Sequence, residues 1–100
     1  MFNAKTNKTG TTLDISLEGV LDTKTSPDLM KVINDNISDV TEVNFDFANL
    51  EFLTSAGLRV LLSARQAMDD KDGQMTLKNV SADIMDIFKL TGFSGILNII

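Results

Sequence analysis

The sequence predicts an α/β fold, a two-layer sandwich in which a mixed, mostly parallel sheet of four to five strands has helices packed on one face. After an initial hairpin, strand-like and helix-like segments alternate, and such crossover connections imply parallel pairing. The strand-like segments alternate apolar with polar residues, whereas strands covered on both faces are typically apolar throughout. We therefore expect a largely solvated opposite face that bears Asp14, Asn44, Asp46 and Thr76.

The first third of the chain predicts a hairpin followed by a helix. Segments 2–8 and 12–17 alternate in polarity on either side of a turn at Gly10. A polar loop over 19–23 then leads to Ser26, which can cap a helix, with a proline next to it at the first helical position. Apolar residues recur on one side of this helix, namely Leu29, Met30, Ile33, Ile37 and Val40. The helix is therefore expected to pack flat on an apolar surface.

The middle third predicts a strand, a turn and a longer helix. Segment 42–47 alternates most clearly and is the best strand of the chain. The turn at residues 54–57 then places a short hydroxyl side chain, Ser55, where the helix begins. Such a side chain can accept hydrogen bonds from free backbone N–H groups, and the positive end of the helix dipole tolerates added negative charge there.

The last third predicts a strand, a short helix and a final strand. After a charged turn over 69–73, segment 74–78 alternates like a strand. Ser81 can cap the short helix and Gly92 can end it. Segment 96–100 is apolar enough to form the last strand.

The helix that begins at Ser55 has two distinct faces when its residues are laid out at about 100° each. One arc is expected to face the sheet: Gly57, Val60, Leu61, Ala64, Ala67 and Met68. The opposite arc holds Ser55, Leu58, Arg59, Leu62 and Gln66, so two leucines are aligned with the serine on the outward side. For Leu58, cover by a neighbouring helix explains the pattern as well as exposure does. For Leu62 a partner surface is favoured.

Composition excludes several classes of function. The 100 residues with 43% hydrophobic content fit one domain, residues 1–100. Because the chain has no cysteine and no histidine, disulfides, Ser-His and Cys-His catalysis and the usual zinc ligands are absent, and we expect neither an enzyme nor a metal or cofactor. The net charge of −5 opposes nucleic-acid binding. No apolar run approaches the roughly 20 residues that span a bilayer, so a cytoplasmic protein is expected.

Ser55 is a candidate acceptor for a regulatory phosphate. From the residues alone, a plain helix cap explains it better, although the two roles are compatible. A phosphate would add a charge of about −1.5 to −2 where the helix dipole favours it, so the fold would be retained. Arg59, one turn further on, could pair with it for a few tenths of a kcal/mol. Against a partner seated on Leu58 and Leu62, the same charge would be desolvated and costly.

Four short motifs are shared, in order and spacing, with a known family. They are residues 19–22 with Thr25, similar to a G-x-L-D-x-x-T loop; the strand end at 46–50; residues 52–58; and residues 90–93. On these residues the chain resembles the STAS family (sulfate transporter and anti-sigma factor antagonist domains) over nearly its full length. Within that family it resembles the small single-domain bacterial anti-sigma factor antagonists.

The resemblance implies a protein–protein switch. In the family, the unmodified antagonist binds an anti-sigma factor that is also a serine kinase with a GHKL-type ATP fold, and this releases the sigma factor. Phosphorylation of the serine at the helix start ends the interaction, and a serine phosphatase resets it. The implied roles are Ser55 as acceptor, Asp22 as the acidic loop residue near it, and Gly57 as the residue that permits close approach. Leu58 and Arg59 would lie in the contact surface, and a monomer is implied for the free protein.

Thr54 departs from the family pattern. Many members have an aspartate immediately before the acceptor, so this chain carries one negative charge less at that point, and Thr54 is itself an alternative acceptor. Without the resemblance, Asp22 would be interpreted as a turn former, and Asp46 is interpreted as structural. The full set of expected partner-binding residues is Asp22, Thr54, Gly57, Leu58, Arg59 and Leu62.

Two other functions stay open at this point. One is a non-phosphorylated STAS adaptor that docks on the ATPase of an ABC transporter. The other is a small nucleotide-binding domain that uses the helix start as a phosphate site. The second is the weakest, because Gly57 stands alone without a G-x-x-x-x-G-K pattern and no histidine or cysteine supplies a base or nucleophile.

Overall fold

A five-stranded sheet forms the frame of the molecule. The structure, a computed structural model, describes residues 2–100. The strands are β1 (Phe2–Thr9), β2 (Thr12–Leu21), β3 (Glu42–Leu53), β4 (Gln74–Lys78) and β5 (Asn98–Ile99), and they lie side by side in that order. β1 pairs antiparallel with β2, and every later pair is parallel. The mixed, mostly parallel sheet is confirmed.

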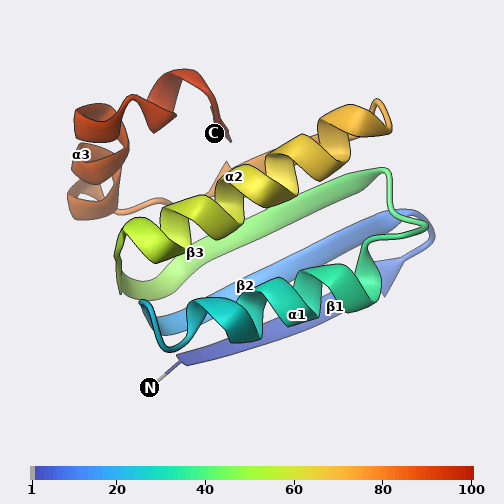
Figure 1. Ribbon diagram of the computed structural model, residues 1–100, viewed down its shortest axis with the longest axis horizontal. Coiled ribbons are helices and arrows are strands. Elements are labelled where there is room, and N and C mark those ends of the chain that lie inside the picture. The colour runs from blue at the N-terminus through green and yellow to red at the C-terminus, as the bar shows by residue number, and fades with distance from the viewer. Residues whose placement is uncertain (1) are drawn as a thin grey trace.

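Two long helices cover one face of this sheet, as Figure 1 shows. They are α1 (Ser26–Asn36) and α2 (Ser55–Asp70). α3 (Ala82–Thr91) lies apart from them and is followed by a short 3₁₀ turn, η1 (Phe93–Gly95). α3 is anchored by buried Ile84 and Phe88, and the Phe88 ring lies 6.1 Å from that of Phe47, centroid to centroid. The predicted two-layer sandwich is therefore confirmed.

The core lies between the helices and the sheet. Alternate residues of the central strands are fully buried and face α1 and α2, and the parallel register places them beside one another, with Leu13 next to Val43 and Ile15 next to Phe45. Because a strand's side chains alternate between its two faces, the predicted apolar set lands on one side of the sheet. At about 1.5–3 kcal/mol for each fully buried large apolar side chain, this layer is the main stabilising element.

The opposite face of the sheet is polar, as predicted. The predicted residues Asp14, Asn44, Asp46 and Thr76 are half-buried, and each bonds to a polar neighbour. Three such bonds run from Asn44 Nδ2 to Asp14 Oδ1 (3.0 Å), from Asn79 Nδ2 to Asp46 Oδ1 (2.9 Å) and from Asn98 Nδ2 to Thr76 Oγ1 (3.2 Å). The bond from Asn79 is the main cause that lowers the pKa of Asp46, which agrees with its structural interpretation.

The two central strands are longer than predicted. β2 continues through Leu21, so the first residues of the predicted 19–23 loop belong to a strand. β3 continues to Leu53, and its pairing with β2 contains two register shifts. The first shift breaks the alternation, so that Leu50 faces the core, and the second restores it, so that Leu53 faces the core as strict alternation would select. A period-two pattern cannot anticipate such a bulge.

The serines expected to cap the first two helices are in fact their first helical residues. The N-caps of α1 and α2 are Thr25 and Thr54, and neither makes a side-chain capping bond. Ser26 instead donates its hydroxyl hydrogen to the carbonyl oxygen of Asp22 at 2.5 Å. Ser55 therefore has a hydroxyl that the helix does not use as a cap.

The end of the chain follows the prediction with one difference. Ser81 caps α3 by accepting the Ile84 N–H at 3.2 Å, and Gly92 ends the helix at a φ of 82°, a conformation that favours glycine. The last strand spans only Asn98–Ile99, because the N–H groups of Ile96 and Leu97 bond back to the Phe93 carbonyl oxygen in the turn that follows η1.

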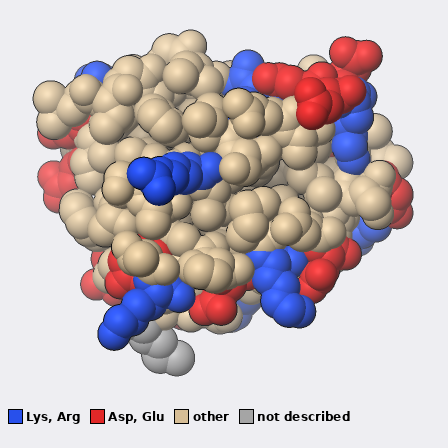
Figure 2. All heavy atoms as spheres, in the orientation of Figure 1, with Lys and Arg blue, Asp and Glu red and all other residues tan. Residues whose placement is uncertain are grey.

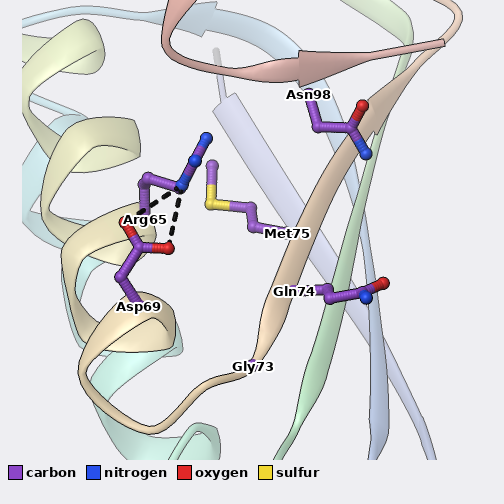
Figure 3. A pocket seen from close by; sticks show the side chains of 6 residues that line it. All are labelled: Arg65, Asp69, Gly73, Gln74, Met75 and Asn98. Carbon is purple, nitrogen blue, oxygen red and sulfur yellow. Dashed lines mark hydrogen bonds and ion pairs between the residues drawn. The ribbon is translucent and has the colours of Figure 1, made fainter.

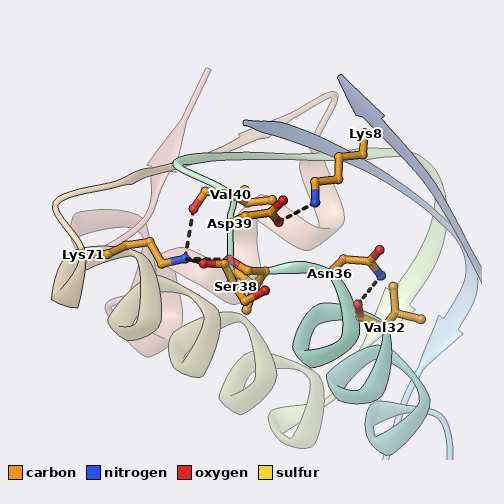
Figure 4. A network of polar contacts seen from close by, with 8 residues as sticks. Lys8, Val32, Asn36, Ser38, Asp39, Val40 and Lys71 are labelled. Carbon is orange, nitrogen blue, oxygen red and sulfur yellow. Dashed lines mark hydrogen bonds and ion pairs between the residues drawn. The ribbon is translucent and has the colours of Figure 1, made fainter. Parts of the chain in front are cut away.

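Lys71 ties the end of α2 to the end of α1 (Figure 4). Its ammonium group donates to the carbonyl oxygens of Ile37 (2.6 Å), Ser38 (3.2 Å) and Val40 (3.0 Å). These carbonyls lie at and just beyond the C-terminus of α1, where a helix leaves acceptors unpaired and its dipole favours a positive charge. The lysine therefore fixes the connection between α1 and β3.

Replacing Lys71 with methionine is expected to lower the free energy of unfolding by about 1 kcal/mol, because three backbone carbonyls, two of them part-buried, lose a charged donor. Lys31→Met is the matched control, since Lys31 pairs only with Asp35 (3.2 Å) on an exposed helix surface and such a pair contributes a few tenths of a kcal/mol. Urea unfolding of both variants measures the difference. Equal losses of unfolding free energy in the two variants would contradict the role of Lys71 in fixing the connection between α1 and β3.

Candidate functional site

The start of α2 is fixed against the end of β2. The Thr54 N–H donates to the Leu21 carbonyl oxygen at 2.9 Å. A Cβ on Gly57 would lie 2.8 Å from Cγ and Cδ2 of Leu21, and 3.2 Å from its carbonyl oxygen, so only glycine fits without displacement. Gly57 is buried. Its close approach is therefore to the chain's own strand, and its place among the partner-binding residues stays a prediction.

The loop that follows β2 is built around Asp22 and Thr25. Asp22 Oδ1 accepts the N–H groups of Lys24 and Thr25, each at 3.0 Å. The Thr25 hydroxyl accepts the Asp22 N–H at 2.8 Å and lies 2.9 Å from the Val20 carbonyl oxygen, to which it donates. The backbone bond from Thr25 is the main cause that lowers the pKa of Asp22. Asp22 is thus a turn former with an ionised carboxylate held close to the start of α2.

The two candidate acceptors differ in access. Ser55 is exposed, whereas the Thr54 hydroxyl oxygen is buried and has no hydrogen-bond partner among the described residues. The first turn of α2 contains no acidic residue, and its first intrahelical bond is from the Leu58 N–H to the Thr54 carbonyl oxygen at 3.1 Å. The hydroxyl of Ser55 therefore lies at a positive helix end that the side chains of that turn do not neutralise.

The predicted outward stripe of α2 is only partly present. Ser55, Arg59 and Gln66 are exposed and Leu62 is half-buried. Leu58 is 5% exposed and belongs to the core, which agrees with the alternative that a neighbouring element covers it, and its role in partner contact stays a prediction. Its burial arises because α1 packs beside α2 in the same layer and the helix start is pressed onto β2. A single helix's periodicity cannot show what its neighbour covers.

Charge on the helical face is unevenly distributed. Figure 2 shows this face as mostly uncharged, with acidic side chains gathered at its upper right, over the end of α2. The exposed aspartates at and just beyond the end of α2 are Asp69, Asp70 and Asp72. This acidic group lies at the opposite end of α2 from Ser55 (Figure 1), so it does not surround the candidate acceptor.

A shallow cavity of about 220 Å³ lies near that same far end of α2 (Figure 3). It is lined by Arg65, Asp69, Gly73, Gln74, Met75 and Asn98. Its charged pair is satisfied internally, because Arg65 Nε donates to both carboxylate oxygens of Asp69 at 3.1 and 3.2 Å. Arg65 is ten residues from Ser55, about 15 Å of helix. The cavity is therefore separate from the candidate acceptor.

Within residues 2–100, no group of three or more potential metal-ligating side chains is placed to hold a metal ion. In the same part of the chain, no helix has both the length and the apolar character needed to cross a membrane.

Comparison with known proteins gives consistent matches over the full length. Residues 3–100 match the family model of the STAS domain. An anti-sigma-B factor antagonist of Staphylococcus aureus is 24% identical over 99 residues, which is 98% of this chain and 92% of that protein. The Bacillus cell fate determinant SpoIIAA in its phosphorylated form has a similar structure, with a TM-score of 0.76 and 24% identity, covering 100% of this chain and 91% of that one. An anti-sigma factor antagonist from Mycobacterium paratuberculosis gives a TM-score of 0.87 at 20% identity, covering 99% and 85%. At these identities the two structures show a shared fold.

Proposed function

We propose that this chain, which belongs to the STAS domain family as its motifs predicted, is an anti-sigma factor antagonist switched by phosphorylation of Ser55. Its partner is an anti-sigma factor with GHKL-type serine kinase activity. The unmodified chain binds that partner and a sigma factor is released. Phosphorylation ends the interaction, and a serine phosphatase restores it. The protein acts by binding rather than catalysis, as a cytoplasmic single domain that is monomeric when free.

The observation that carries the proposal is the setting of Ser55. Its side chain is exposed at the start of α2, next to a neighbour whose hydroxyl is buried. The names of the matched proteins support the same function, since one is an anti-sigma-B factor antagonist and another is SpoIIAA in a phosphorylated form. Exposure makes Ser55 accessible to a kinase, and the free N–H groups of the helix start favour the negative product.

The contact surface in this proposal consists of exposed groups near Ser55. Arg59 lies one turn further along α2 and is exposed, and half-buried Leu62 offers apolar area beyond it. Asp22, whose ionised carboxylate bonds to its own loop, directly follows Leu21, and the Leu21 carbonyl oxygen bonds to the helix start. Leu58 and Gly57 support this surface from beneath, because both are buried.

Incubation with the cognate anti-sigma kinase and ATP is expected to add one phosphate, at Ser55. Tandem mass spectrometry locates the site, and Ser55→Ala is expected to remain unmodified while still binding the kinase. The buried hydroxyl of Thr54 predicts that Thr54→Val is modified as readily as the wild type. Stable binding to the kinase with no phosphate added to Ser55 or Thr54 would contradict the proposed phosphorylation switch.

The same experiment separates the adaptor alternative. A STAS adaptor for a transporter ATPase binds its ATPase and is not a kinase substrate. Binding of such an ATPase by the purified chain, together with absence of Ser55 phosphorylation by the kinase, would replace the antagonist proposal.

A further inference from the structure

An aromatic side chain is exposed on the polar face of the sheet, close to the candidate acceptor. Phe52 is 48% exposed. In the parallel register it lies beside Val20, while the next pair, Leu21 and Leu53, is buried in the core. Because successive residues of a strand point to opposite faces, Phe52 and Val20 point away from the helical layer.

The apolar pair of Phe52 and Val20 lies next to the start of α2, which is hydrogen-bonded to the end of β2. Phe52 is three residues before Ser55, and Val20 is two residues before Asp22. The bond from the Thr54 N–H to the Leu21 carbonyl oxygen (2.9 Å) holds the two strand ends together immediately beyond the pair. The exposed aromatic ring and the candidate acceptor therefore lie at the same end of the sheet, one on its open face and the other in the helical layer.

The surroundings of the pair are mainly acidic. Glu51, which precedes Phe52, is exposed. Glu18 is exposed two residues before Val20 and therefore lies on the same face. The Asp22 carboxylate follows at the loop, where Lys24 is the one basic side chain. An exposed aromatic ring bordered by carboxylates complements an apolar pocket bordered by basic side chains.

We infer that the contact surface of the proposed antagonist extends from the start of α2 around the end of the sheet onto its open face, with Phe52 as an aromatic anchor. The inference rests on the proposed function. The partner that binds this extended surface is the anti-sigma factor. It would receive Phe52 in an apolar pocket, and lysine or arginine side chains at the rim of that pocket would pair with Glu18 and Glu51. Since Glu18 lies on the open face and Ser55 in the helical layer, the basic rim and the phosphorylation switch occupy different parts of the interface.

Titration calorimetry of the purified anti-sigma factor with the full chain tests this surface. Phe52→Ser is expected to weaken binding about tenfold, as for a buried aromatic anchor, whereas Phe52→Tyr keeps the ring and stays within about twofold of wild type. Ile96→Ser is the matched control, because Ile96 is similarly exposed, at 44%, but lies near Arg65 far along α2. It is expected to bind like wild type.

A charge variant gives an independent readout. Glu18 is exposed and outside the core, so Glu18→Lys is expected to keep the fold even if Phe52→Ser does not. It should weaken binding about threefold and reduce the dependence of affinity on salt concentration, since a charge pair across the interface is lost. Urea unfolding verifies that each variant is folded.

The outcomes distinguish this inference from the function on which it rests. Wild-type affinity in both Phe52→Ser and Glu18→Lys, with binding still lost in Ser55→Asp, would overturn the extended surface and leave the antagonist function standing. Absence of binding by the unmodified wild type would overturn the antagonist function. A dimer in sedimentation that Phe52→Ser dissolves would assign the face to a second copy of the chain and overturn the inference.

Discussion

Replacing Ser55 with aspartate is expected to weaken binding to the anti-sigma factor roughly a hundredfold, about 2.7 kcal/mol. A carboxylate at this exposed position would be desolvated against the partner without a paired cation, which is costly. The same charge at the start of α2 is favoured by the helix dipole, by about 0.3–1 kcal/mol. Binding should therefore fall while the free energy of unfolding stays level or rises. Calorimetry and urea unfolding measure the two quantities.

Ser63→Asp is the matched control for this substitution. Ser63 is an exposed serine on the same helix, two turns beyond Ser55 and outside its first turn. Its replacement adds the same charge to the same helix, so it should leave the affinity nearly unchanged. If both aspartate variants lost binding equally, net charge would explain the effect and Ser55 would have no special position.

Replacing Gly57 with valine is expected to lower the free energy of unfolding by about 3 kcal/mol, at the upper end of overpacking costs. The added carbon atoms would lie within 2.8 Å of the Leu21 side chain and 3.2 Å of its carbonyl oxygen. That carbonyl accepts the Thr54 N–H at 2.9 Å, so it cannot move without breaking the bond that fixes the helix start. Urea unfolding measures the loss.

Two further glycine variants calibrate this result. Gly57→Ala makes the same close contact with less volume and gains some helix propensity, so a smaller loss of about 1 kcal/mol is expected. Gly95→Ala is the control, since an added Cβ there meets nothing within 4 Å, and it should stay within about 0.5 kcal/mol of wild type. Equal stability of the Gly57 and Gly95 variants would contradict the close packing of α2 on β2.

The candidate site was predictable where it depends on local chemistry. A short hydroxyl residue after a strand and before an apolar helical repeat predicts a helix start, and Ser55 lies at one. The turn-forming interpretation of Asp22 needed only its position in a polar loop, and its carboxylate does bond to the loop backbone. The role of Ser55 as acceptor and of Asp22 as a partner residue stays a prediction.

The residues that sequence reasoning misplaced or missed depend on neighbours from elsewhere in the chain. For Leu58 the pattern of its own helix left cover and exposure equally open, and the packed layer buries it. Gly57 was placed near a partner, whereas it contacts Leu21. The exposure of Phe52 on the open face was missed because the strand was predicted to end at residue 47, whereas β3 pairs with β2 as far as Leu53.

The sequence by itself determined the fold class, the one-sided helical layer and the position of the hydroxyl turn, because periodicity and helix-start chemistry act over a few neighbouring residues. Only the tertiary structure decided which hydroxyl is accessible, which leucine is covered and how far β3 extends past Phe47. Ser55 is exposed and the Thr54 oxygen buried because α2 is pressed onto the end of β2. Burial depends on contacts between segments distant in sequence, and these exist only after the chain has packed.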